Sequence, residues 1–338
     1  MSTPREDGLR MPAEWAPHQA TLMQWPTITR MSLWGELFDR AKMDFASVAN
    51  AVAAFEPVVM VTDPPQASEA RAMCNDGVEI LPIPIDDSWV RDNGPIFVTD
   101  AHGGVALVHF RFNSWGNKYL PFDRDADVPK QVASHMGMRR YAAPMVLEGG
   151  SFFVDGEGTL LTTERCLLHP NRNPNMTREQ IERTLGDYLG VEHVIWLGRG
   201  HPLDRDTDGH VDAIAQYLRP GVILLDAPGD PADPNHAASQ DNLARLRAAH
   251  DAAGRPIEVV AFEAGTPSDT AYMNHYLANG AVIVPADGKP SDDAALGQLR
   301  DAYPDREIVT VPGATLLEGG GGPHCITQQI PSGATTLT

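Results

Sequence analysis

Five segments of the chain carry apolar residues at the spacing of an amphipathic helix. These segments cover residues 39–55, 128–138, 177–189, 237–252 and 292–302. The third has the clearest ends, because Thr177 and Gln180 can form a capping box and Gly190 follows the last apolar position. Each segment leads into a short run rich in β-branched and aromatic residues, which predicts a buried strand. These runs cover residues 58–61, 141–146, 193–196, 257–262 and 307–311.

Polar or glycine-rich motifs follow these strands at corresponding places, and several of them run directly into predicted β-hairpins. The hairpins pair residues 96–98 with 105–109, 151–154 with 159–163, and 213–218 with 222–225. The motifs lie at residues 89–95, 147–150, 209–212, 272–275 and 317–325. The tetrapeptide Leu-Glu-Gly-Gly occurs in the second and in the fifth motif, which indicates that the five units are related.

Five units of about 50–60 residues indicate a closed radial array, because no polar capping unit stands at either end. A Rossmann fold or a barrel would alternate single strands with helices, whereas here about three strands accompany each helix. We therefore predict an α/β fold, a five-bladed propeller of ββαβ-type repeats whose motif loops meet at the central axis. We expect a single catalytic domain spanning residues 1–338, with about ten N-terminal and about eight C-terminal residues loosely ordered.

The composition bears on the kind of partner. Twenty-six Lys and Arg residues stand against 45 Asp and Glu residues, a net charge of −19. Such a negative field argues against nucleic acid and anionic membranes and favours cationic ligands. No apolar run approaches the roughly 20 residues of a membrane span, and the first residues lack the apolar core of a signal peptide. Three widely separated cysteines fit neither a disulfide framework nor a zinc knuckle, so we expect a reducing, cytoplasmic location.

Cys325 differs from the other two cysteines because it follows four consecutive glycines at 319–322. Glycines remove the side chains from that stretch, so a flat ligand can approach the backbone closely. A phosphate-binding loop is excluded, because the Lys-Ser/Thr pair that should follow is absent. We therefore expect Cys325 to be reactive and Cys74 and Cys166 to be buried small hydrophobic residues. The neighbouring His324 should point to the opposite face if the segment is extended.

His210 and Asp212 lie one residue apart in a segment with the pattern of a strand, so both side chains should project from the same face. A metal site would need a third ligand at a characteristic spacing, so we expect neither metal nor cofactor. Asp92 and Glu148 hold corresponding places in the first two repeats. Carboxylates that face one cavity repel each other unless a cation lies among them, and a guanidinium pairs bidentately with carboxylates. The pattern predicts a site for a small guanidinium compound.

These motifs, in this order and over nearly the whole chain, resemble those of the agmatine deiminase family. That family belongs to the guanidine-modifying pentein superfamily and is related to bacterial peptidylarginine deiminases. The resemblance begins at Met-Pro-Ala-Glu-Trp-Ala-Pro-His at residues 11–18 and ends at residues 319–329. It implies the pentein fold and a hydrolase that converts agmatine to N-carbamoylputrescine and ammonia without a cofactor.

The resemblance also implies roles for individual residues. Cys325 would be the nucleophile and His210 the general acid and base, with a thiouronium intermediate on the cysteine. Asp92 and Asp212 would bind the guanidinium nitrogens, and Glu148 would partner His210 and the reacting group. Further substrate contacts would come from Trp89, Asp206, Gly320 and Gly321.

Two departures from the family pattern affect the pocket. This chain has Gly322-Pro323 where the family usually has Asn-Ile, and Ala213 where it usually has Asn. The substrate could therefore be another guanidine, such as arginine, a guanidino acid, a peptidyl arginine or a natural-product intermediate. The reaction could also be amidino transfer, in which the covalent intermediate passes to an amine instead of water. A guanidine-binding sensor without turnover would keep the carboxylates but would not need Cys325 and His210 together. A cysteine hydrolase of amides needs Cys and His too, but the ring of acids would destabilise its anionic intermediate. A homo-oligomer is possible.

Overall fold

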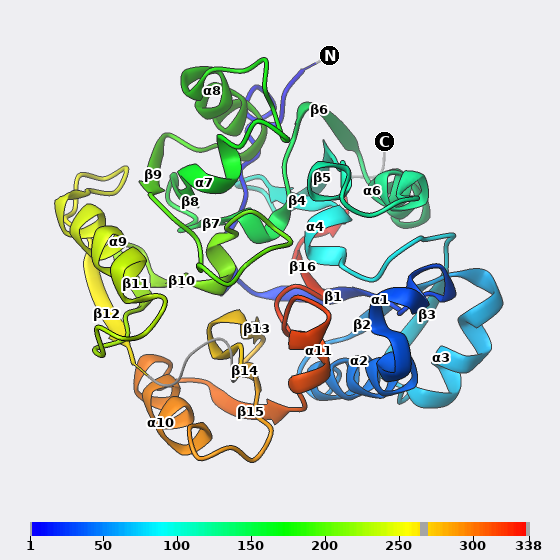
Figure 1. The fold of residues 1–338 in the computed structure, drawn as a ribbon. Coiled ribbons are helices and arrows are strands. Elements are labelled where there is room, and N and C mark those ends of the chain that lie inside the picture. Colours follow the sequence, from blue (N-terminus) through cyan, green and yellow to red (C-terminus); the bar gives the residue numbers. More distant parts are fainter. Residues whose placement is uncertain (1, 264–269, 336–338) are drawn as a thin grey trace.

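The computed structural model describes residues 2–263 and 270–335, and its strands form five small sheets around a common centre (Figure 1). The longer helices lie at the periphery of this ring. This arrangement is the α/β propeller predicted from the five sequence repeats.

The blades are numbered in the order in which the chain enters them. The first contains β1 (His18–Gln24), β2 (Val58–Thr62), β3 (Val78–Pro82) and β16 (Thr327–Pro331). The second contains β4 (Ile96–Thr99), β5 (Gly104–Arg111), β6 (Arg140–Val146) and β17 (Ala334–Thr335). The third contains β7 (Phe152–Val154), β8 (Thr159–Thr163) and β9 (His193–Leu197). The fourth contains β10 (Ala215–Arg219), β11 (Val222–Asp226) and β12 (Glu258–Phe262), and the fifth contains β13 (Tyr276–Ala278), β14 (Ala281–Pro285) and β15 (Glu307–Val311).

The helices fall into two groups. The longer ones are α2 (Phe38–Val52), α6 (Asp123–Met136), α8 (Arg178–Leu189), α9 (His236–Ala248) and α10 (Asp292–Ala302). The shorter α-helices are α1 (Met31–Trp34), α3 (Ala67–Met73), α4 (Val90–Asn93), α5 (Ser114–Asn117), α7 (Glu164–Leu167) and α11 (Ala314–Glu318). The 3-10 helices are η1 (Ile28–Arg30), η2 (Gly35–Leu37), η3 (Pro64–Gln66), η4 (Gly149–Ser151), η5 (Val211–Ala213) and η6 (Tyr272–Asn274).

One local rule builds most of the blades. In the fourth blade β10 and β11 form an antiparallel hairpin, α9 crosses over, and β12 returns parallel to β11. The third and fifth blades repeat this path with α8 and α10 as the crossover helices. The short helices that precede the hairpins contact each other in turn, α4 with η4, η4 with η5 and η5 with η6. The predicted motifs therefore meet near the centre of the ring.

The first blade joins the two ends of the chain. Strand β16 pairs antiparallel with β1, with Thr21 opposite Gln329, and β1 pairs parallel with β2. The last blade motif, which ends at Cys325, is thereby fixed beside the first. This pairing closes the ring, as the absence of capping units in the sequence predicts.

Helix α8 illustrates why the predicted helices form. The Thr177 side chain accepts the backbone N–H of Gln180, and the Gln180 side chain accepts the backbone N–H of Thr177, which completes the capping box. Gly190 ends the helix in the left-handed conformation, at φ +72°. The buried stripe of Ile181, Leu185 and Leu189 packs into the apolar core of the second and third blades.

The structure differs from the sequence prediction at several boundaries. The strand predicted at 213–218 begins only at Ala215, because the preceding residues form the 3-10 helix η5. The helix predicted at 128–138 begins at Asp123, so that Pro129 lies inside it. Strands β1 and β3 and helix α3 were not predicted. Pairing across the sheet stabilises both strands more than their local sequence does.

Backbone hydrogen bonds hold the segment that precedes β1. The N–H groups of Arg5 and Met11 donate to the carbonyls of Asp187 and Leu189, and Arg10 pairs with Thr99. At the other end, residues 336–338 lie outside the described residues. The order of the two ends and the single-domain organisation stay predictions. None of the described helices has the length and apolar character needed to cross a bilayer.

Candidate active site

Cys325 lines a cavity of about 210 Å³. Its backbone N–H donates to the side-chain oxygen of Asn274 at 3.1 Å, and its thiol lies 3.5 Å from Asp212 Oδ2. Burial, together with the negative charges of Asp212 and Asp92, raises the pKa of the Cys325 thiol well above its ordinary value. Without a ligand the sulfur is therefore protonated at neutral pH.

The glycines before Cys325 are needed for contacts within the protein. A β-carbon on Gly321 would lie 2.7 Å from the ring of Trp89 and 3.0 Å from Cys325 Sγ. Gly320 has a φ of +102°, which favours glycine, and it lines the cavity together with Gly321. The stretch thus brings the backbone close to the sulfur and leaves the cavity open beside it.

His210 and Asp212 reach the cavity from a different local structure than the sequence predicts. They do not lie on a strand: His210 precedes the 3-10 helix η5, and Asp212 lies within it. The preceding Gly209 has a φ of +105°, which turns the chain before β10 can begin. Both side chains are nevertheless buried and line the same cavity as Cys325.

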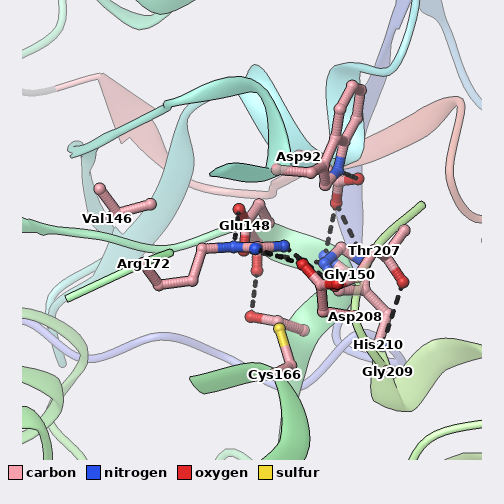
Figure 2. A network of polar contacts seen from close by, with 12 residues as sticks. Asp92, Val146, Glu148, Gly150, Cys166, Arg172, Thr207, Asp208, Gly209 and His210 are labelled. Carbon is pink, nitrogen blue, oxygen red and sulfur yellow. Dashed lines mark hydrogen bonds and ion pairs between the residues drawn. The ribbon is translucent and has the colours of Figure 1, made fainter. Parts of the chain in front are cut away.

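Two carboxylates flank His210 (Figure 2). Its Nδ1 lies 3.7 Å from Asp92 Oδ1, and its Nε2 lies 3.7 Å from Glu148 Oε2. Burial favours the neutral imidazole, but Asp92, Cys166 and Glu148 outweigh it and raise the pKa of His210 well above its ordinary value. The ring is therefore charged at neutral pH and able to donate a proton.

Asp92, on helix α4, is held by two donors. Its Oδ1 accepts the backbone N–H of Gly150 at 3.0 Å, and its Oδ2 accepts the indole N–H of Trp115 at 2.9 Å. A β-carbon on Gly150 would lie 2.7 Å from His210 Nδ1, 2.8 Å from Asp212 Oδ2 and 2.9 Å from Asp92 Oδ1. Glycine at this position is what lets the three side chains converge.

Glu148 is completely buried behind His210 and is not among the residues that line the cavity. Its Oε1 accepts Arg172 Nε at 2.6 Å, and Arg172 Nη1 donates to Asp208 Oδ2 at 2.7 Å (Figure 2). Burial alone would raise the pKa of Glu148, but the charges of Arg172 and His210 lower it. Arg172 thus keeps Glu148 ionised, and the sequence analysis did not identify it.

His324 also faces the site, contrary to the sequence expectation. The chain turns at this point and is not extended, so His324 and its neighbour Cys325 both contact Asp212. The ring bridges two carboxylates, with Nδ1 2.9 Å from Asp212 Oδ2 and Nε2 2.9 Å from Glu14 Oε2. These partners raise the pKa of His324 against the effects of burial and of Arg91. Burial would raise the pKa of Asp212, but the hydrogen bond and charge of His324 lower it.

Trp89 and Asp206 also lie beside Cys325. They line a smaller hollow that also includes Asp92, Trp115 and Cys325. Asp206 lines both this hollow and the main cavity, and its Oδ1 accepts the hydroxyl of Tyr119. The structure therefore brings every predicted site residue to Cys325 or to the two hollows beside it, with Glu148 behind His210.

The other two cysteines, like Cys325, form no disulfide bond. Cys74 follows α3 and is half-buried, whereas Cys166 is completely buried in α7. Cys166 contributes to an apolar cluster, as predicted, but it also lies against Glu148 and His210. In the described part of the chain, these three side chains are a group that could hold a metal ion.

Comparison with known proteins agrees with this geometry. A family model described as Porphyromonas-type peptidyl-arginine deiminase matches residues 10–331. The agmatine deiminases of Pseudomonas aeruginosa and Stutzerimonas stutzeri are each 43% identical over 362 residues, covering 98% of this chain and 98% of those proteins. The solved structure of agmatine deiminase of Enterococcus faecalis matches with a TM-score of 0.93 at 36% identity, covering 98% of each chain. As its motifs predict, the chain therefore belongs to the family of the agmatine deiminases and the Porphyromonas-type peptidyl-arginine deiminases.

Proposed function

We propose that the protein is an agmatine deiminase, which hydrolyses the guanidinium group of agmatine to give N-carbamoylputrescine and ammonia. The observation that carries this proposal is the convergence of the Cys325 thiol, the His210 imidazole and several carboxylates around one cavity. The names of the relatives support the same activity. A sensor without turnover would not need a thiol beside a charged imidazole.

The carboxylates select the reacting group. Asp92 and Asp212 converge beside Gly150, and neither faces a Lys or Arg side chain at hydrogen-bond distance within the described residues. His210 and His324 lie beside them, yet burial and the charges of Asp212 and Glu148 still raise the pKa of Asp92. A planar guanidinium would neutralise both and present its central carbon to the sulfur.

The acidic lining of the cavity favours an ammonium over a carboxylate. Besides Asp212, four acidic side chains belong to its described lining: Asp204, Asp206, Asp226 and Glu318. Arg205 is the single Lys or Arg residue in this described lining. The aminobutyl chain of agmatine ends in an ammonium, whereas arginine would bring a carboxylate against these acids. Asp206, which lines both hollows, is our choice for the ammonium partner.

The substrate itself activates the nucleophile. Cys325 is protonated in the free enzyme, but a bound guanidinium places a positive charge beside the sulfur and lowers the thiol pKa. The thiol proton passes to solvent, and the thiolate then attacks the guanidinium carbon and forms a C–S bond in a tetrahedral adduct. His210 protonates the departing nitrogen, the C–N bond breaks, and ammonia leaves a thiouronium on Cys325.

His210 serves both halves of the reaction. After ammonia leaves, its neutral ring takes a proton from water, and the hydroxide adds to the thiouronium carbon. The C–S bond breaks, Cys325 departs as a thiolate, and the ureido product is released. Glu148 and Arg172 position His210, while His324 and Glu14 hold Asp212. Each step uses side chains of the chain and one water molecule.

A substrate panel tests the proposed activity. We expect ammonia release from agmatine with a kcat/KM at least about 100-fold above that for arginine or guanidinobutyrate, because their carboxylates meet the acidic lining. The assay measures ammonia and identifies the product by chromatography, without any added amine acceptor. Faster turnover of arginine or of a peptidyl arginine would reassign the substrate. A requirement for an acceptor amine would indicate amidino transfer.

We also propose a cytoplasmic location. The three cysteines are free, and a nucleophilic thiol survives best in a reducing compartment. A homo-oligomer stays a prediction.

A further inference from the structure

The thiol of Cys166 has no part in the proposed reaction, yet it lies directly against two groups that do. Ligand atoms of Glu148, Cys166 and His210 all lie within 4.8 Å of one another, and all three side chains are buried. The Cys166 sulfur points toward Glu148 in Figure 2. The three residues come from η4, α7 and η5 or the residues beside them, so only the fold brings them together.

The polar atoms that face this group lack hydrogen-bond partners. Glu148 Oε2 and His210 Nε2 are buried and form an ion pair with each other, but neither makes a hydrogen bond within the part of the chain that the structure describes. Buried polar atoms are nearly always paired, so these mark a place for something else. His210 Nε2 and Glu148 Oε2 are 3.7 Å apart. Two ligands of a tetrahedral zinc ion are about 3.3–3.5 Å apart, from the usual bond lengths.

Neighbouring side chains orient Glu148 and His210 so that each turns one atom toward the proposed ion. Arg172 Nε binds Glu148 Oε1 at 2.6 Å, which leaves Oε2 available. Asp92 Oδ1 lies 3.7 Å from His210 Nδ1, on the ring nitrogen that does not face Glu148. A carboxylate on the outer nitrogen of a histidine is the usual support of a zinc-bound ring. The remaining ligand is a thiol, which suits zinc and cobalt better than magnesium or calcium.

We propose that Glu148, Cys166 and His210 bind a divalent ion of the zinc and cobalt type, and that the bound ion inhibits the enzyme. Binding forms one bond each to sulfur, nitrogen and oxygen, and releases the thiol and imidazolium protons to solvent. The ion takes the place of the proton on His210 Nε2, so the ring can no longer alternate between imidazolium and imidazole as the proposed reaction requires. The inhibition rests on the proposed function, whereas the binding does not.

Cobalt absorption tests the binding independently of turnover. Co²⁺ added to the protein should produce a thiolate-to-cobalt charge-transfer band in the near ultraviolet. We expect Cys166→Ser to lose this band, and the matched variants Cys325→Ser and Cys74→Ser to keep it. A band that persists in Cys166→Ser, or that disappears in Cys325→Ser, would overturn the proposal. Cys166→Ala, checked by circular dichroism, replaces the serine variant if the latter does not fold.

The inhibition is tested with Zn²⁺ during ammonia release from agmatine, each variant being compared with its own rate without metal. We expect reversible inhibition that a chelator removes. Cys166→Ser should raise the Zn²⁺ concentration for half-inhibition by at least about tenfold, because one ligand of the ion is lost. Equal sensitivity of Cys166→Ser and the unaltered chain would place the inhibitory ion elsewhere. If the chain does not act on agmatine, the cobalt band still decides whether the site exists.

Discussion

Replacement of Cys325 by alanine should lower kcat for agmatine by at least about 10⁴-fold, since no other group can form the covalent intermediate. Agmatine binding should remain measurable, because Asp92, Asp212 and Asp206 still surround the cavity. The acids that bind the cation are thus separable from the sulfur that reacts with it. The turnover number is measured from ammonia release, and binding by isothermal titration calorimetry.

Cys74→Ala is the matched control for this variant. Cys74 is a free, half-buried cysteine that follows α3, outside both hollows. It should retain the rate of the unaltered protein. A Cys325→Ala variant that turns over agmatine at a comparable rate would rule out the thiolate mechanism and favour direct attack by water.

Replacement of His210 by glutamine should lower kcat by about 10⁴-fold, at the upper end of what general acid–base catalysis contributes. The effect is large because one ring protonates the departing nitrogen and later activates the water. Glutamine has a similar reach and keeps a hydrogen-bond donor near Glu148, but it cannot exchange a proton. The difference in kcat between His210→Gln and the unaltered protein therefore reports the loss of proton transfer and not a loss of packing.

Single-turnover kinetics, supported by far-ultraviolet circular dichroism, measure the effect of His210→Gln. His102→Gln serves as its control, because His102 is exposed in the turn between β4 and β5. A rate for His210→Gln within tenfold of the unaltered protein would assign the proton transfers to another group. His324, buried beside Asp212, would then be the first candidate.

The repeated pattern of helix, strand and hairpin predicts the propeller because each blade depends mainly on local signals. Helix α8 begins and ends where its capping box and Gly190 indicate. Strand β1 was missed, because its stability comes from pairing with β16 at the other end of the chain. Strand β10 begins later than predicted, because Gly209 and η5 turn the chain after the hydrophobic pattern has already begun.

The groups proposed to touch the substrate could be predicted from the sequence, as could Glu148, but Arg172, Glu14 and the contact of His324 with Asp212 could not. His210, Asp212 and Cys325 stand in conspicuous motifs, and the structure places them around one cavity. Arg172 has no such motif, and only the fold brings it to Glu148. Glu14 lies within the motif at residues 11–18, but the neighbouring sequence does not indicate that it pairs with His324, 310 positions away. Contacts of this kind depend on the closed ring.

Mass spectrometry of the protein, quenched in acid during turnover of agmatine, tests the central claim most directly. We expect a species that is heavier than the free protein by the mass of agmatine minus that of ammonia. The added group should lie on the peptide that contains Cys325. This species should be absent from Cys325→Ala. Ammonia release without an adduct at any quench time, or an adduct on another residue, would contradict attack by the Cys325 sulfur on the guanidinium carbon.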